Sequence, residues 1–122
     1  MFSLYQFSYD EHNWGDEVDS QETAEAMMLH MAHTRSWESR PISDEVVNRY
    51  NGFSLPELEA AVLDGILEYM PSNKALAAEI AHAPFHKLQE KLTQEGGQFV
   101  GGSFYEFEGN HNDTLIYVVV AT

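Results

Sequence analysis

The chain has 122 residues, of which 43% are apolar and 12% aromatic, so it can build one hydrophobic core but not two independent ones. It contains no cysteine, which excludes disulfides, thiolate zinc sites and thiol nucleophiles. Its formal net charge of −14 disfavours direct binding to nucleic acids or to anionic membranes. We therefore expect one acidic domain over residues 1–122.

The sequence shows no sign of export or membrane insertion. Its first ten residues lack the cationic start of a signal peptide. No apolar run approaches the about 20 residues that cross a bilayer. A soluble, cytoplasmic protein is therefore the expectation.

The N-terminal part predicts one strand followed by one helix. In residues 2–9 an alternating pattern places Tyr5, Phe7 and Tyr9 on one face, with Phe2 and Leu4 on the other, which is typical of a β-strand. After a polar loop, Asp19 and Glu22 have the spacing of a capping box, and a helix is expected from Ser20 to about Arg35.

The middle of the chain predicts several helices. Pro41 and Ser43 are expected to open a short helix. Ser54 and Glu57 form a second capping box, which starts the most apolar helix of the chain. Pro84 is expected to break the remaining helical pattern into two short helices, over residues 72–81 and 85–94.

The C-terminal part changes to the alternating pattern of strands. Residues 98–107 and 114–120 predict a hairpin whose turn is 108–113, with a bulge at Gly101-Gly102. Residues 114–120 are apolar on both faces, so this strand should lie in the middle of the sheet. The expected fold class is α+β, with a small antiparallel sheet, made of the N-terminal strand and the C-terminal hairpin, packed against four to five helices.

The histidines raise the question of a metal site. His30 and His33 are three residues apart, and His82 and His86 are four apart, which are spacings that can chelate a metal on a continuous helix. Because Pro84 is expected to break the helix between the second pair, a structural reading is favoured. No metal and no cofactor is predicted.

Signatures of catalysis are missing as well. No serine lies in a nucleophile-elbow pattern, and the paired glycines match neither GxGxxG nor a P-loop. We therefore do not expect an enzyme.

The acidic residues gather toward both ends of the chain. The first 34 residues carry seven acids and no Lys or Arg, and residues 92–122 carry four acids and again no base. If the first strand pairs antiparallel with the last, the loop 10–19 and the turn 108–113 meet at one end of the sheet. Pairing of the first strand with residues 98–107 would instead separate them.

These features suggest a protein inhibitor. Carboxylates on a rigid scaffold can imitate the charge spacing of a duplex, about one charge per 1.7 Å, and fill the basic groove of a nuclease or another nucleic-acid-binding protein. DNA-mimic anti-restriction and anti-CRISPR proteins and toxin immunity proteins are examples of this strategy, and the chain resembles them only in size, in charge and in the absence of catalytic signatures. Aromatic anchors beside the acids are Tyr9, Trp14, Trp37 and Tyr105.

The expected partner is thus a basic protein, with no direct contact to nucleic acid or membrane. The alternative is an acidic adaptor or oligomerisation module that binds its partner through an apolar surface, using the first helix or a sheet edge. For the inhibitor, the predicted partner-binding residues are Asp10, Glu11, Trp14, Asp16, Glu17, Asp19, Glu22, Glu106, Glu108 and Asp113.

Overall fold

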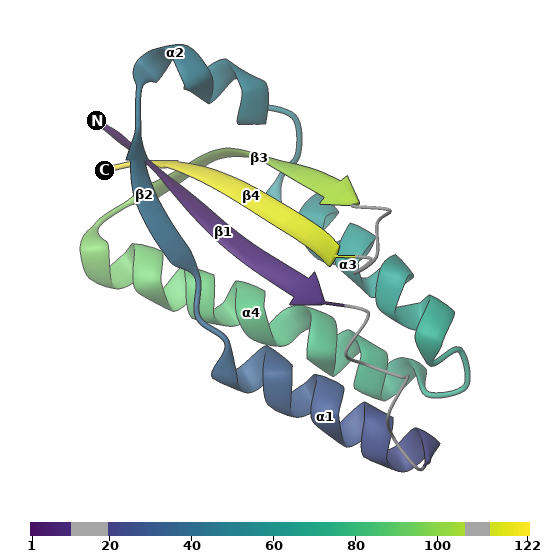
Figure 1. Ribbon diagram of the computed structural model, residues 1–122. Helices are drawn as coiled ribbons and strands as arrows, with labels where there is room; N and C mark the ends of the chain where they lie inside the picture. Colours follow the sequence, from purple (N-terminus) through teal and green to yellow (C-terminus); the bar gives the residue numbers. More distant parts are fainter. Residues whose placement is uncertain (11–19, 107–112) are drawn as a thin grey trace.

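The computed structural model describes residues 1–10, 20–106 and 113–122, and for residues 9, 10, 105, 106, 113 and 114 it describes the backbone alone (Figure 1). The described part has an α+β fold, as expected. Its elements are β1 (Phe2–Asp10), α1 (Gln21–Thr34), β2 (Glu38–Ile42), α2 (Asp44–Val47) continued by the 3-10 turn η2 (Asn48–Tyr50), α3 (Leu55–Tyr69), α4 (Lys74–Glu95), β3 (Gln98–Glu106) and β4 (Asp113–Ala121).

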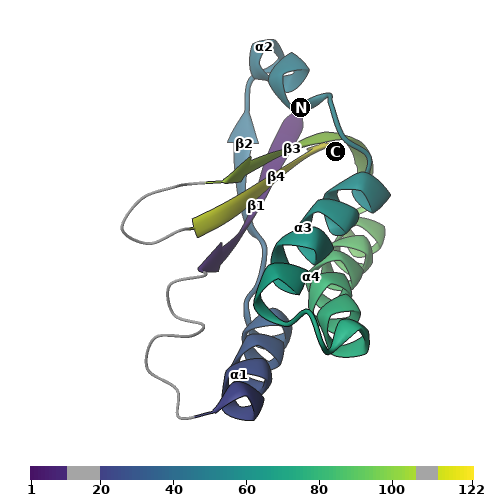
Figure 2. The same ribbon diagram turned by 90° about the vertical axis from the view of Figure 1, so that its right-hand side faces the viewer.

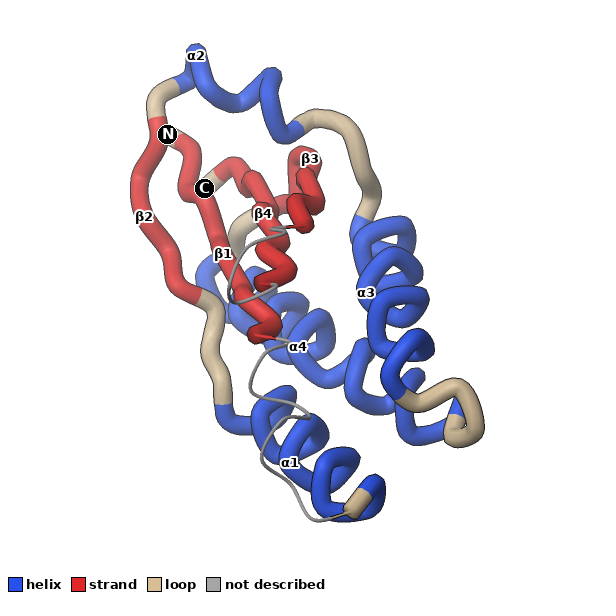
Figure 3. Tube along the Cα trace, turned by 45° about the vertical axis from the view of Figure 1, so that its right-hand side comes forward, coloured by secondary structure: helices blue, strands red, loops and turns tan. Residues whose placement is uncertain are grey.

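The four strands form one antiparallel sheet in the order β2-β1-β4-β3 (Figure 3). β4 lies in the interior of the sheet, which confirms the interpretation of its apolar run. Because β1 and β4 are antiparallel neighbours, the two termini lie side by side, and the backbone N–H and hydroxyl of Thr122 both donate to the carbonyl of Met1.

Helices cover the two faces of the sheet unequally. α1, α3 and α4 lie against one face, where Phe7, Ile116 and Val118 join the main core (Figure 2). On the opposite face a smaller cluster joins Leu4 and Val119 to Val47 of α2. Burial on both faces explains why β4 lacks the polar alternation of a half-exposed strand.

β2 is a strand that the sequence did not predict, since Pro41 was expected to open a helix. Its residues Glu38–Ile42 pair with Phe2–Gln6 of β1 at the edge of the sheet. An edge strand tolerates proline, because only one side of its backbone pairs with a neighbour. Four of the five residues are exposed, so the segment has no apolar alternation to reveal it.

α4 also corrects the prediction, because it is one helix of 22 residues that continues through Pro84. A proline inside a helix costs about 3 kcal/mol relative to alanine. Here the flanking residues are buried in the main core, among them Ala81, Phe85 and Leu88, and packing overrides the local preference. His82 and His86 consequently share one helix face.

Helix and strand ends follow the sequence signals with small shifts. The N-cap of α1 is Ser20, whose side chain accepts from the Thr23 N–H, so the predicted capping box starting at Asp19 is wrong. The capping box of Ser54 and Glu57 on α3 is confirmed. The register shift in β3 lies between Phe99 and Gly101, directly before the predicted glycine pair.

Candidate functional site

The register of the two central strands brings three of the predicted site residues to one place. Tyr9 pairs with Thr114 and Asp10 with Asp113, while Glu106 of β3 pairs with Thr114 from the other side. The two acidic segments can start from the same end of the sheet only if β1 pairs with β4, and this is the pairing observed. We call this end of the sheet, defined by Asp10, Glu106 and Asp113, the anionic end.

The remaining predicted residues divide into two groups. Glu22 is exposed on the first turn of α1, and Figures 1 and 2 place the start of this helix apart from the end of β1. The other predicted residues lie outside the described part of the chain, in segments 11–19 and 107–112, which continue from Asp10 and from Glu106 respectively. They are Glu11, Trp14, Asp16, Glu17, Asp19 and Glu108.

Like charges meet at the anionic end. Asp10 and Asp113 occupy directly opposed positions of neighbouring antiparallel strands. Like charges in this relation destabilise a sheet by a fraction of a kcal/mol. The register of β1 and β4 therefore places two acids at opposed positions, where charge alone would not favour the pairing.

Three of the bases, in contrast, are bonded to backbone carbonyls of the fold. Arg35 donates to the carbonyl of Ser8, and Lys87 donates to the carbonyls of His33 and Arg35. Lys91 reaches the carbonyl of Trp37 at 3.5 Å. Three of the six bases thus hold the chain between α1 and β2, and we call residues 33–37 with these three side chains the cationic junction.

The carboxylates have few cationic partners. Between the described side chains, the ion pairs are His82 with Glu59 and His86 with Glu90, and none involves Lys or Arg. The acids in this part of the chain are half-buried or exposed. In the described part of the chain, the negative charge therefore lies at the surface of the fold.

Trp37 is not a surface anchor, contrary to the prediction. It is 4% exposed, and its indole N–H donates to the carbonyl of Pro84 at 2.6 Å. Its ring packs against Phe7 and Phe85, with centroid distances of 5.4 and 5.8 Å. The residue belongs to the core beneath the cationic junction. The side chains of Tyr9, Trp14 and Tyr105 lie outside the described residues.

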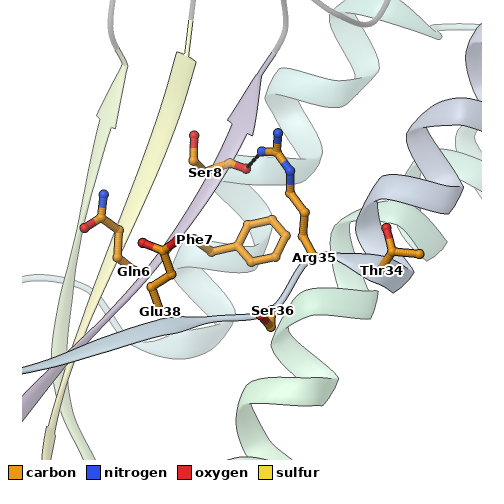
Figure 4. A pocket seen from close by; sticks show the side chains of 7 residues that line it. All are labelled: Gln6, Phe7, Ser8, Thr34, Arg35, Ser36 and Glu38. Atoms are coloured by element: carbon orange, nitrogen blue, oxygen red, sulfur yellow. Dashed lines mark hydrogen bonds between the residues drawn. The ribbon is translucent and has the colours of Figure 1, made fainter.

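A polar cavity of about 440 Å³ lies next to the anionic end (Figure 4). β2 pairs with β1 only as far as Gln6, so Ser8 lies beyond the end of β2, and Arg35 reaches across the opening to its carbonyl. The lining contains no histidine, and its charged groups are one guanidinium and one carboxylate. It consists of Gln6, Phe7, Ser8, Thr34, Arg35, Ser36 and Glu38.

No pattern in the sequence indicates this cavity, because the cavity depends on where β2 ends along β1. β2 itself could not be recognised from its residues. Arg35 lies at the end of the predicted first helix, but its partner, Ser8, is 27 positions away in the chain.

One tyrosine, Tyr5, has a raised pKa, but it lies in the core. Tyr5 is 2% exposed and donates its hydroxyl to Glu95. Burial, and then the hydrogen bond and negative charge of Glu95, raise the pKa of Tyr5 to about 12. Tyr5 therefore stays neutral at ordinary pH and links β1 to the end of α4.

Comparisons with known proteins identify no relative: no family model, no curated protein and no solved structure matches this chain. Within the described ranges, no three His, Asp or Glu side chains are grouped so that they could hold a metal ion. None of the helices in these ranges has the length and apolar character needed to cross a membrane.

Proposed function

We propose that this protein is a small inhibitor that binds and blocks a basic nucleic-acid-binding protein or nuclease. The observation that carries the proposal is the β1–β4 register, which sets Asp10 opposite Asp113 and attaches both acidic segments to one end of the sheet. A basic groove that binds the phosphates of a nucleic-acid backbone can also bind carboxylates that are clustered at the end of a rigid sheet.

The distribution of charge supports this proposal. The described acids form no ion pairs with Lys or Arg, while Arg35, Lys87 and Lys91 are bonded to backbone carbonyls. An uncompensated negative surface accelerates encounter with a basic partner and makes the association rate dependent on salt.

The adaptor alternative has weaker support. Apart from the terminal Met1, the large apolar side chains that are most exposed among the described residues are Met27, Phe53 and Tyr69. They come from three different places in the chain: α1, the loop before α3 and the end of α3. Single exposed apolar residues are normal on a protein surface and do not indicate an interface.

A pull-down with two matched variants tests the proposal. One variant carries Asp16→Lys, Glu17→Lys and Asp19→Lys, in the segment that continues from the anionic end. The control carries Asp64→Lys, Glu68→Lys and Glu79→Lys, on exposed positions of α3 and α4. Both raise the net charge by the same amount.

Bound proteins are eluted by a salt gradient, and the association rate of any captured partner is then measured. We expect a basic protein that DNA or RNA displaces, and that associates at least about tenfold more slowly with the first variant than with the control at low salt. Equal rates for the two variants, or a neutral partner retained through high salt, would contradict the proposal.

A further inference from the structure

The continuity of α4 creates a histidine pair on the surface that the anionic end does not involve. His82 and His86 are one turn apart on the same helix face, on either side of Pro84. Their ring centroids are 5.8 Å apart, and each side chain is 59% exposed. Both rings are therefore exposed to solvent and close enough to contact the same ligand.

Each of these histidines is oriented by a carboxylate. Nδ1 of His82 lies 2.8 Å from Oε1 of Glu59 on α3, and Nε2 of His86 lies 3.1 Å from Oε1 of Glu90 on the next turn of α4. In both rings the second nitrogen, Nε2 of His82 and Nδ1 of His86, has no hydrogen-bond partner among the described residues. A histidine that ligates a metal characteristically gives its other ring N–H to a carboxylate.

The separation of the rings suits a shared ion. With metal–nitrogen bonds of about 2.0 to 2.1 Å, a metal lies about 3.2 Å from each ring centroid. Two such rings are then about 5.2 Å apart at a tetrahedral angle and about 6.4 Å apart when opposed. The observed 5.8 Å falls between these limits, so the separation of the two rings is compatible with one shared ion.

We propose that His82 and His86 bind one divalent transition-metal ion, with Glu59 and Glu90 as positioning residues. Imidazole ligands favour Zn²⁺, Cu²⁺ or Ni²⁺ over Mg²⁺ and Ca²⁺, which prefer oxygen. Two protein ligands leave the remaining positions of the ion to water. The site does not depend on the proposed inhibitory function.

Titration of the untagged full chain with Zn²⁺ by calorimetry, and with Co²⁺ by visible absorption, tests this inference. We expect one ion per chain at this site, lost by at least about tenfold in affinity in His82→Ala or His86→Ala. Because an imidazole must be unprotonated to ligate, the affinity should fall as the pH is lowered. The matched control is His30→Ala with His33→Ala, a pair at three-residue spacing on α1.

Glu59→Gln separates orientation from ligation. Loss of a carboxylate that holds a ligating histidine typically lowers metal affinity 10- to 100-fold. We expect weaker binding with an unchanged Co²⁺ spectrum, since Glu59 does not touch the ion. Circular dichroism confirms folding, which should persist because the two rings are exposed. Unchanged affinity in His86→Ala, or equal loss in the α1 control, would overturn the proposal.

Discussion

The cationic junction and the anionic end both involve β1, at Ser8 and at Asp10 respectively, yet they use charge in opposite ways. At the junction, Arg35, Lys87 and Lys91 are bonded to backbone carbonyls over residues 8 and 33–37. At the anionic end, Asp10 and Asp113 occupy opposed register positions on two paired strands. The cations of the junction thus support the architecture, whereas the register of the sheet end brings two residues of like charge to neighbouring strands.

The largest effect is expected in the core beneath the junction. Trp37→Ala removes a buried ring and the hydrogen bond to Pro84, and we expect the free energy of unfolding to fall by about 3 to 5 kcal/mol. Urea denaturation measures this change. Trp37→Phe, which keeps a ring but loses the indole N–H, should cost clearly less. Equal losses in both variants would mean that packing volume contributes little here.

Alkaline pH should lower the free energy of unfolding, because the pKa of the buried Tyr5 is raised. Above pH 10 the unfolded chain loses the Tyr5 proton, whereas the folded chain keeps it until its pKa of about 12, so stability falls across this window. The raised pKa of Tyr5 corresponds to about 2 to 3 kcal/mol of stability at most. Stability measured from pH 9 to 12 should decline less steeply in Tyr5→Phe than in the wild type. Parallel curves would contradict the assignment.

The junction cations can be tested one at a time. Lys87→Met removes the donor to two carbonyls after α1 and should cost about 1 to 2 kcal/mol. Lys74→Met is the matched control, because Lys74 is exposed at the start of α4, and its effect should stay within about 0.5 kcal/mol. Chemical denaturation of both variants decides whether the junction differs from an ordinary surface lysine.

The smallest expected effect has the opposite sign. Asp10→Asn with Asp113→Asn relieves repulsion across the register pair, so stability should rise by about 0.2 to 1 kcal/mol at low salt. The gain should shrink in 1 M salt, because the Debye length falls to about 3 Å. Ser3→Ala with Ser39→Ala provides a neutral double substitution on neighbouring strands. A loss of stability in the Asn variant would show that the two acids support the fold.

Much of the fold was visible in the sequence wherever the local pattern and the packing agree. β4 was placed inside the sheet because both of its faces are apolar, and the start of α3 was recognised from Ser54 and Glu57. β2 and the continuity of α4 were missed because Pro41 and Pro84 are locally unfavourable, and only tertiary context makes them acceptable. The exposed sheet edge accommodates Pro41, and the burial of the middle of α4 compensates for Pro84.

The candidate site was predictable only in part for a related reason. The acidic segments could be listed from the sequence, but whether they meet depended on a choice between two strand pairings. The register of Asp10 with Asp113 decides that choice. The spacing of His82 and His86 places both on one helix face only if the helix continues through Pro84, and the local sequence predicts a break there.

The adjacent chain ends have a mechanical consequence. Thr122 is bonded to Met1, and the strands that follow from them, β1 and β4, are antiparallel neighbours. Hydrogen bonds in such a pair run perpendicular to the strands, so a force that separates the two ends loads them one after another. We expect β1 and β4 to separate pair by pair at low force. Phe2 and Ala121 would separate first, and Asp10 and Asp113 would separate last.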